Sequence, residues 1–148
     1  MQDKDILQGV AETLIGSASY TITVPIKEPI IPKRSIWDRL LRRPKIEPEM
    51  ERTFNIHQCV VGNMYRIASK AVLLPNEILS GTQAQSMLPV INDHLLTMVY
   101  IVAAGIQNTK HEPAVELIEF IQDNFEAEDL YNTLLPVLEN LGIQSFFN

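Results

Sequence analysis

The chain has 148 residues, of which 46% are hydrophobic and 20% charged, and its formal net charge is −6. This length suits one domain, and this composition is close to the globular average, which excludes a largely disordered chain and a repetitive fibre. The single cysteine, Cys59, excludes an internal disulfide and a zinc site built from several cysteines.

Two elements are predicted in residues 1–24. Apolar residues recur at helical spacing within residues 5–15, which indicates a helix. Residues 19–24 then alternate between small polar side chains and larger apolar ones. This alternation predicts a strand that buries Tyr20, Ile22 and Val24 on one side.

The next segment, residues 25–52, is rich in proline and in basic residues. Residues 25–45 hold seven basic and two acidic residues, a net charge of +5, whereas residues 46–148 have a net charge of −9. Proline removes a backbone donor, so we expect an extended linker or a long loop between two strands. Such a basic arm either lies on its own acidic body, stays solvated, or contacts an acidic partner, a membrane surface or nucleic acid.

Within this arm, the sequence predicts a short helix. Ser35 and Asp38 have the spacing of a capping box, and Pro44 ends the pattern. A helix of two turns is not stable alone in water, so it has to dock on its own domain or in a groove on a partner. The candidate partner-binding residues are Trp37, Arg39, Leu40, Leu41, Arg42 and Arg43, together with Phe146 and Phe147 of the apolar C-terminal segment.

Alternation resumes at residues 53–61, which predicts a second strand, antiparallel to the first, with Phe54 and Ile56 on its apolar side. Helical patterns follow, with Asn63 as the expected cap of the first one and Pro113 in the first turn of a later one. The predicted helices cover about 63–72, a short turn at 75–77, about 83–107, 114–124 and about 128–141.

These elements predict an α+β, mostly helical fold, in which a short antiparallel pair of strands packs against four or five helices. Residues 1–24 and 53–148 are expected to form one domain, interrupted by the arm at residues 25–52.

The sequence offers few candidates for chemistry. Cys59 and His57 are two residues apart, so a thiol enzyme or ligand-binding domain is one alternative, and a structural cysteine is the other. The histidines lack metal-ligand spacing and the glycines are scattered, so no metal, cofactor or catalytic residue is predicted. Acidic residues form a helical stripe, either a solvated face or a surface for a basic partner: Glu112, Glu116, Glu119 and Asp123.

The N-terminal residues lack the features of a signal peptide, so the cytoplasm is the expected compartment. The apolar run at residues 95–106 is too short to span a bilayer and predicts a core helix, with no transmembrane segment. The acidic body disfavours nucleic acid as a partner, and Trp37 is the only aromatic residue among the bases of the arm.

Two stretches resemble tail-assembly-chaperone-like proteins of phages and prophages. RTFNIHQCVVGNMYRIA (residues 52–68) resembles their short strand, glycine and helix, and residues 117–132 resemble their closing acidic helices. The similarity covers residues 52–142, and the proline-rich arm departs from it. The resemblance implies a protein without catalytic residues, which binds a tail component before assembly and keeps it soluble by covering apolar surface.

Together these observations predict a non-enzymatic protein-binding or assembly protein. Its expected partner is another protein, such as a phage tail component, or a second copy of itself. The alternatives are a small thiol enzyme or ligand-binding domain that uses Cys59 and His57, and an adaptor that binds a membrane surface or nucleic acid through its arm.

Overall fold

The computed structural model describes residues 19–79 and 88–141. The helix predicted within residues 5–15, the beginning of the long helix predicted from residue 83, and the apolar C-terminal segment with Phe146 and Phe147 lie outside these residues. The elements, in chain order, are β1 (Tyr20–Pro25), α2 (Ile36–Leu40), β2 (Glu51–Ile56), α3 (Val61–Ala71), α4 (Asn76–Leu79), α5 (Leu88–Gln107), α6 (Val115–Asn124) and α7 (Ala127–Glu139). This is the predicted mixed α+β, mostly helical fold.

β1 and β2 form a two-stranded antiparallel sheet in which Ile22 lies opposite Phe54 and Thr23 opposite Thr53. One side of the sheet is apolar and buried, because Ile22, Val24 and Phe54 all point toward the helices. The other side is polar, and the hydroxyls of Thr23 and Thr53 lie 2.8 Å apart. The predicted alternation and strand pairing are therefore confirmed.

The sheet is fixed to the body by aromatic packing. The ring of Phe54 meets that of Phe120 edge-on, with 5.4 Å between centroids, and lies 6.0 Å from that of Phe125. β1 also contacts α7, and β2 contacts α5. Because two strands alone are marginally stable, this packing is what holds the sheet in place.

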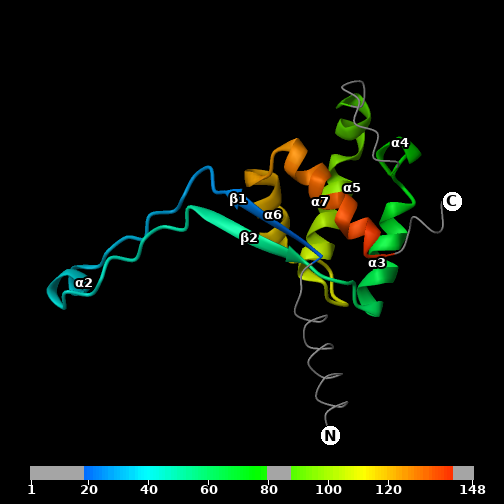
Figure 1. Cartoon of the computed structure of the whole chain (residues 1–148). Coiled ribbons are helices and arrows are strands. Elements are labelled where there is room, and N and C mark those ends of the chain that lie inside the picture. Colours follow the sequence, from blue (N-terminus) through cyan, green and yellow to red (C-terminus); the bar gives the residue numbers. More distant parts are fainter. Residues whose placement is uncertain (1–18, 80–87, 142–148) are drawn as a thin grey trace, which may run out of the picture.

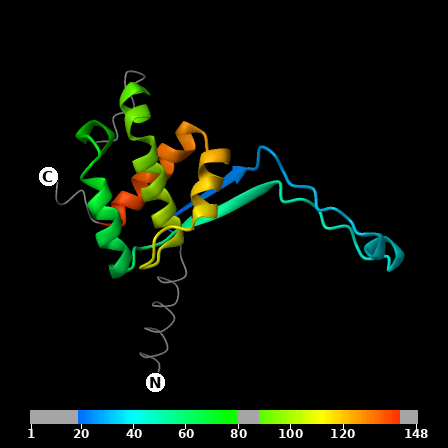
Figure 2. The ribbon, with the colours of Figure 1, turned by 180° about the vertical axis from the view of Figure 1, so that it is seen from behind.

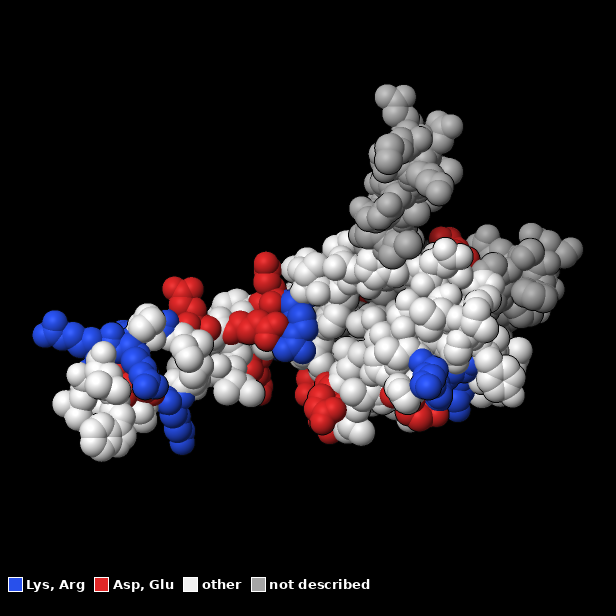
Figure 3. All heavy atoms as spheres, turned by 90° about the horizontal axis from the view of Figure 1, so that it is seen from below, with Lys and Arg blue, Asp and Glu red and all other residues white. Residues whose placement is uncertain are grey.

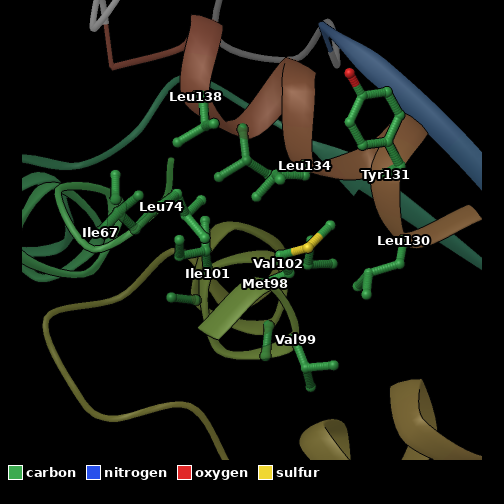
Figure 4. Close-up of a cluster of buried hydrophobic side chains, with 14 of the residues drawn as sticks. Ile67, Leu74, Met98, Val99, Ile101, Val102, Leu130, Tyr131, Leu134 and Leu138 are labelled. Atoms are coloured by element: carbon green, nitrogen blue, oxygen red, sulfur yellow. The ribbon is translucent and has the colours of Figure 1, made fainter. Parts of the chain in front are cut away.

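α5 is the central helix, and α3, α6 and α7 pack around it. Its buried side includes Met98, Ile101 and Val102, which face side chains of α3 and α7 (Figure 4). Gly105 lets α7 come close, because a Cβ there would lie 2.5 Å from a methyl group of Val137.

The second strand is shorter than predicted, and the helix after it begins earlier. β2 ends at Ile56, and α3 begins at Val61 with Val60 as its N-cap. Asn108, at positive φ beyond the end of α5, binds this connection: it accepts from the N–H of Val60 at 2.9 Å and donates to the carbonyl of Gln58 at 2.9 Å.

Asn63 was predicted as the cap of α3, and this is wrong. It lies inside the helix and is fully buried, and its side-chain amide donates to the carbonyl of Ala104 at 2.8 Å. A buried amide needs such a partner, and this one comes from α5, far away in the sequence.

The last two helices begin close to where the sequence placed them. α6 begins at Val115 with Ala114 as its N-cap, so Pro113 precedes the helix instead of lying in its first turn. α7 begins with a capping box, in which the N–H of Glu126 donates to the carboxylate of Asp129 at 3.0 Å.

Between β1 and β2 the chain leaves the body as a long projecting loop. The predicted arm of residues 25–52 is slightly shorter here, because Pro25 belongs to β1 and residues 51–52 belong to β2, so the arm is residues 26–50. Two opposite views show the arm pointing away from the helices, with α2 at its outer end (Figures 1 and 2). The domain is thus one helical body that carries a single extended excursion from its sheet.

Replacing Gly105 by alanine is expected to destabilise the body, because the new methyl group would overlap Val137. Overpacking lowers the free energy of unfolding, whereas the higher helix propensity of alanine partly offsets this loss. The net loss should be about 1–2 kcal/mol, measured by urea denaturation. The double variant Gly105→Ala/Val137→Ala removes the clash, so its loss should be smaller than the sum of the two single losses. Strictly additive losses would contradict the close packing of α5 on α7.

Candidate functional site

The two legs of the arm run next to each other without forming a sheet. The ladder of β1 and β2 continues for one more bond, from the N–H of Ile26 to the carbonyl of Met50 at 2.8 Å. Beyond it, four prolines interrupt the legs, and each removes a backbone donor. They are Pro29, Pro32, Pro44 and Pro48. The predicted extended, irregular segment is therefore confirmed, and it forms a long loop between two strands.

The outer end of the arm is nevertheless closed by specific bonds. Ser35 and Asp38 form the predicted capping box of α2, with both bonds at 3.2 Å. The guanidinium of Arg34 donates to the carbonyl of Arg43. Arg43 in turn pairs with Asp38 at 3.3 Å. These bonds connect the two legs at the tip, so the five-residue helix α2 is held in a closed loop.

The apolar side chains of the arm are exposed. Trp37 is 71% exposed, and the arm's other large apolar side chains, apart from Ile26, are between 60% and 87% exposed. They are Ile30, Ile31, Ile36, Leu40, Leu41, Ile46 and Met50. In this structure the tip is not docked on the described body, which was one of the two alternatives. Sequence reasoning found Trp37, Leu40 and Leu41 but missed the isoleucines between the prolines.

The charges of the arm are divided along its length. Basic side chains gather around the apolar tip, whereas acidic side chains lie nearer the body (Figure 3). Arg39 and Arg42 are exposed at the tip, and neither forms an ion pair with another residue of the described part. The tip therefore exposes an indole and two leucine side chains, and the same short segment carries the unpaired guanidinium groups of Arg39 and Arg42.

A groove of about 760 Å³ lies where the arm joins the body, and we call it the root groove. Its apolar lining comes from Ile26 and Ile30 of the arm and from Phe120 of α6. Acidic side chains surround this lining: Glu28 and Glu49 of the arm, and Glu116, Glu119 and Asp123 of α6. The sequence indicated the acidic stripe but not the arm residues that complete the groove.

Two basic residues fix the arm at this groove. Lys27 forms an ion pair with Glu126, and its backbone N–H donates to Asn124 at 3.0 Å. Arg52 holds both carboxylate oxygens of Glu49, at 2.8 and 2.7 Å, and lies 4.2 Å from the centre of the Phe120 ring. The hydrogen bond from Arg52 holds the pKa of Glu49 below its usual value.

Glu112, predicted to belong to the acidic stripe, has a different role. It lies in the loop before α6, accepts from the hydroxyl of Tyr100 at 2.6 Å, and pairs with Arg66. The bond from Tyr100 and the nearby guanidinium of Arg66 hold the pKa of Glu112 below its usual value. Among the described residues, the part of the stripe without an ion pair is therefore reduced to Glu116, Glu119 and Asp123.

The thiol pair of the alternative prediction does not lie on a strand, because β2 ends before it. Cys59 is half-buried, and burial raises the pKa of its thiol, although the amide of Asn63 donates to the sulfur at 3.4 Å. The backbone carbonyl of His57 accepts from Asn140 at 3.2 Å. This environment does not activate a thiolate, which would need a lowered pKa.

No cluster of three potential metal ligands occurs in the described residues. α5 is long and apolar enough, by length and composition alone, to cross a membrane. However, its Met98, Ile101 and Val102 are buried between the other helices, as expected for the predicted core helix.

Comparisons with protein-family models, with curated proteins and with solved structures gave no significant match.

Cys59 should react slowly in the native protein. Because burial raises its pKa, a smaller fraction is thiolate at neutral pH than in the unfolded chain. We expect iodoacetamide to modify the native protein more slowly than the same protein in urea at equal pH, measured by mass spectrometry over time. Faster modification of the native protein would favour the thiol-enzyme alternative.

Trp37→Ala is expected to leave the stability of the body unchanged, because the indole is mostly exposed. The free energy of unfolding should change by less than about 0.5 kcal/mol. Ile56→Ala, in the buried core, is the comparison and should lose about 2–5 kcal/mol by urea denaturation. Equal losses would show that Trp37 belongs to the core.

Proposed function

We propose that this chain is a non-enzymatic protein-binding protein and that the tip of its arm is the binding element. The observation that carries the proposal is the concentration of large exposed apolar side chains on the arm, from Ile30 to Met50. Large apolar side chains that are exposed to water together on a projecting element are typical of a protein interaction site.

The construction of the tip supports the same proposal. The capping box of α2 and the bonds of Arg34 and Arg43 hold Trp37, Leu40 and Leu41 on a closed loop. A preformed element loses less conformational entropy when it binds. Tryptophan and arginine are also the residues most often found at energetic centres of interfaces.

In its most specific form, the proposal is an assembly chaperone of phage or prophage tails. The support is the resemblance of residues 52–142 to tail-assembly-chaperone-like proteins, together with an arm suited to cover apolar surface on a partner. In this role the arm binds a tail component before assembly and keeps it soluble. Release then requires only that the assembling tail competes for the same apolar surface.

A membrane-surface adaptor is supported less well. The arm combines basic and apolar residues, but α2 has only five residues, and a short helix buries little apolar area in a lipid interface.

Photo-crosslinking at the tip tests the proposal. A benzophenone amino acid replaces Trp37 in one variant and Tyr65 in the other. Tyr65 is the control position, because it is an aromatic residue on α3 that is 82% exposed. In the cells where the chain naturally occurs, we expect a dominant protein crosslinked at position 37 and absent at position 65, identified by mass spectrometry. Co-expression should then keep that protein in the supernatant, and Trp37→Ala should abolish this effect while Tyr65→Ala should not.

Equal crosslinking at both positions, or co-expression effects that survive Trp37→Ala, would contradict a binding role for the tip. Binding of the wild-type chain to anionic lipid vesicles, lost in Trp37→Ala, would instead support the membrane adaptor.

A further inference from the structure

We propose that the tip of the arm docks in the root groove of a second copy of this chain, and that two copies exchange their arms reciprocally. The inference rests on the proposed function, because it identifies a partner for the same binding element. It starts from the exposed face of Trp37, Leu40 and Leu41.

The tip has no access to the root groove of its own chain. The groove lies at the inner end of the arm, whereas both views of the ribbon place α2 at the outer end, away from the body (Figures 1 and 2). Two such arms lying antiparallel would bring each tip to the other's root. The distance from tip to root is the same in both copies, so one twofold axis satisfies both contacts.

The charges of the tip and of the root groove are complementary. In the described part of the chain, Glu28, Glu116, Glu119 and Asp123 have no ion pair with Lys or Arg, and all four border the groove. The tip carries Arg39 and Arg42, also unpaired there. Opposite potentials across an interface favour the correct pairing and speed the encounter.

The apolar side chains of the tip also suit the apolar lining of the root groove. Ile26, Ile30 and Phe120 line the groove, and its volume of about 760 Å³ is of the size that accommodates an organic ligand of several rings. The indole of Trp37 and a leucine side chain therefore have an apolar surface to cover, while Arg39 and Arg42 supply the charge that the acids of the groove attract.

The body has a second exposed apolar surface, which suits the tip less well. It lies on α3 and its C-cap and includes Val61, Tyr65 and Val72. Lys70 belongs to the same helix, and Lys110 lies against Gly62. Basic neighbours would repel the basic tip, so charge favours the root groove as the docking surface.

Reciprocal exchange also explains why the contact can be stable. A twofold interface contains every contact twice, so both tips and both grooves are covered in a closed dimer with no free ends. A one-way contact would instead leave one tip and one groove exposed and would propagate into chains.

Charge reversal on each side of the contact tests this proposal in the full chain. Arg39→Glu/Arg42→Glu changes the tip, and Glu116→Lys/Glu119→Lys changes the groove. Glu128→Lys/Glu139→Lys on α7 is a control with the same charge change as the groove variant. The oligomeric state is measured by sedimentation velocity over a range of protein concentrations. We expect the wild type and the control to dimerise, and each of the other variants to dimerise at least about tenfold more weakly.

Mixing the tip variant with the groove variant should restore the dimer, because an acidic tip then meets a basic groove while the wild-type tip meets the wild-type groove. Circular dichroism checks that each variant is folded. A wild type that stays monomeric at every concentration, a dimer unaffected by either reversal, or a mixture that remains monomeric would overturn the proposal.

These outcomes are separate from those of the proposed function. A monomeric wild type that still crosslinks to a different protein through position 37 would overturn arm exchange and leave the protein-binding role intact. A dimer that follows the charge pattern, without any other protein captured at position 37, would support arm exchange and leave the assembly role without its partner.

Discussion

The packing of Phe54 against Phe120 and Phe125 determines where the arm begins. It fixes one side of a two-stranded sheet to α6 and its C-cap, and the register then places Pro25 opposite Glu51. Both ends of the arm therefore leave the body side by side. The prolines that follow end the ladder after one more bond, so the arm extends as two unpaired legs instead of a longer sheet.

The helical body does not depend on the arm for its core. The buried apolar cluster is built by α3, α5 and α7 around residues such as Ile67, Ile101 and Leu134, all fully buried. None of the described arm residues belongs to this cluster, and Ile26 at the inner end of the arm is only partly covered. The core of the body therefore does not need the apolar side chains of the arm. The stability of the described domain does not explain why the tip carries apolar residues.

Local sequence patterns predicted the local features well. Alternation at residues 19–24 identified β1 and its buried side, and the spacing of Ser35 and Asp38 identified the cap of α2. Both follow from neighbours in the chain, which is why they could be predicted. The prolines likewise predicted an irregular segment, because the loss of a backbone donor is a property of the residue itself.

The features that were missed depend on residues far apart in the sequence. Asparagine is a residue type that often caps helices, but Asn63 instead donates to the carbonyl of Ala104 on α5, which gives it a buried partner. Glu112 has the spacing of the acidic stripe, but Arg66 of α3 forms an ion pair with it and Tyr100 of α5 donates a hydrogen bond to it. The root groove joins Ile26 to Phe120, and no local pattern reports such a contact.

Tertiary pairing also decides which charges remain available for binding. Arg66 neutralises Glu112, Lys27 neutralises Glu126, and Arg52 neutralises Glu49, so these acids are occupied within the described domain. What remains on α6 is a row of like charges on successive turns, which repel one another. A basic group that arrives there relieves this repulsion in addition to forming its own contact. Because these charges lie at the surface, salt screens both effects, so the attraction between the root groove and any basic partner is strongest at low ionic strength.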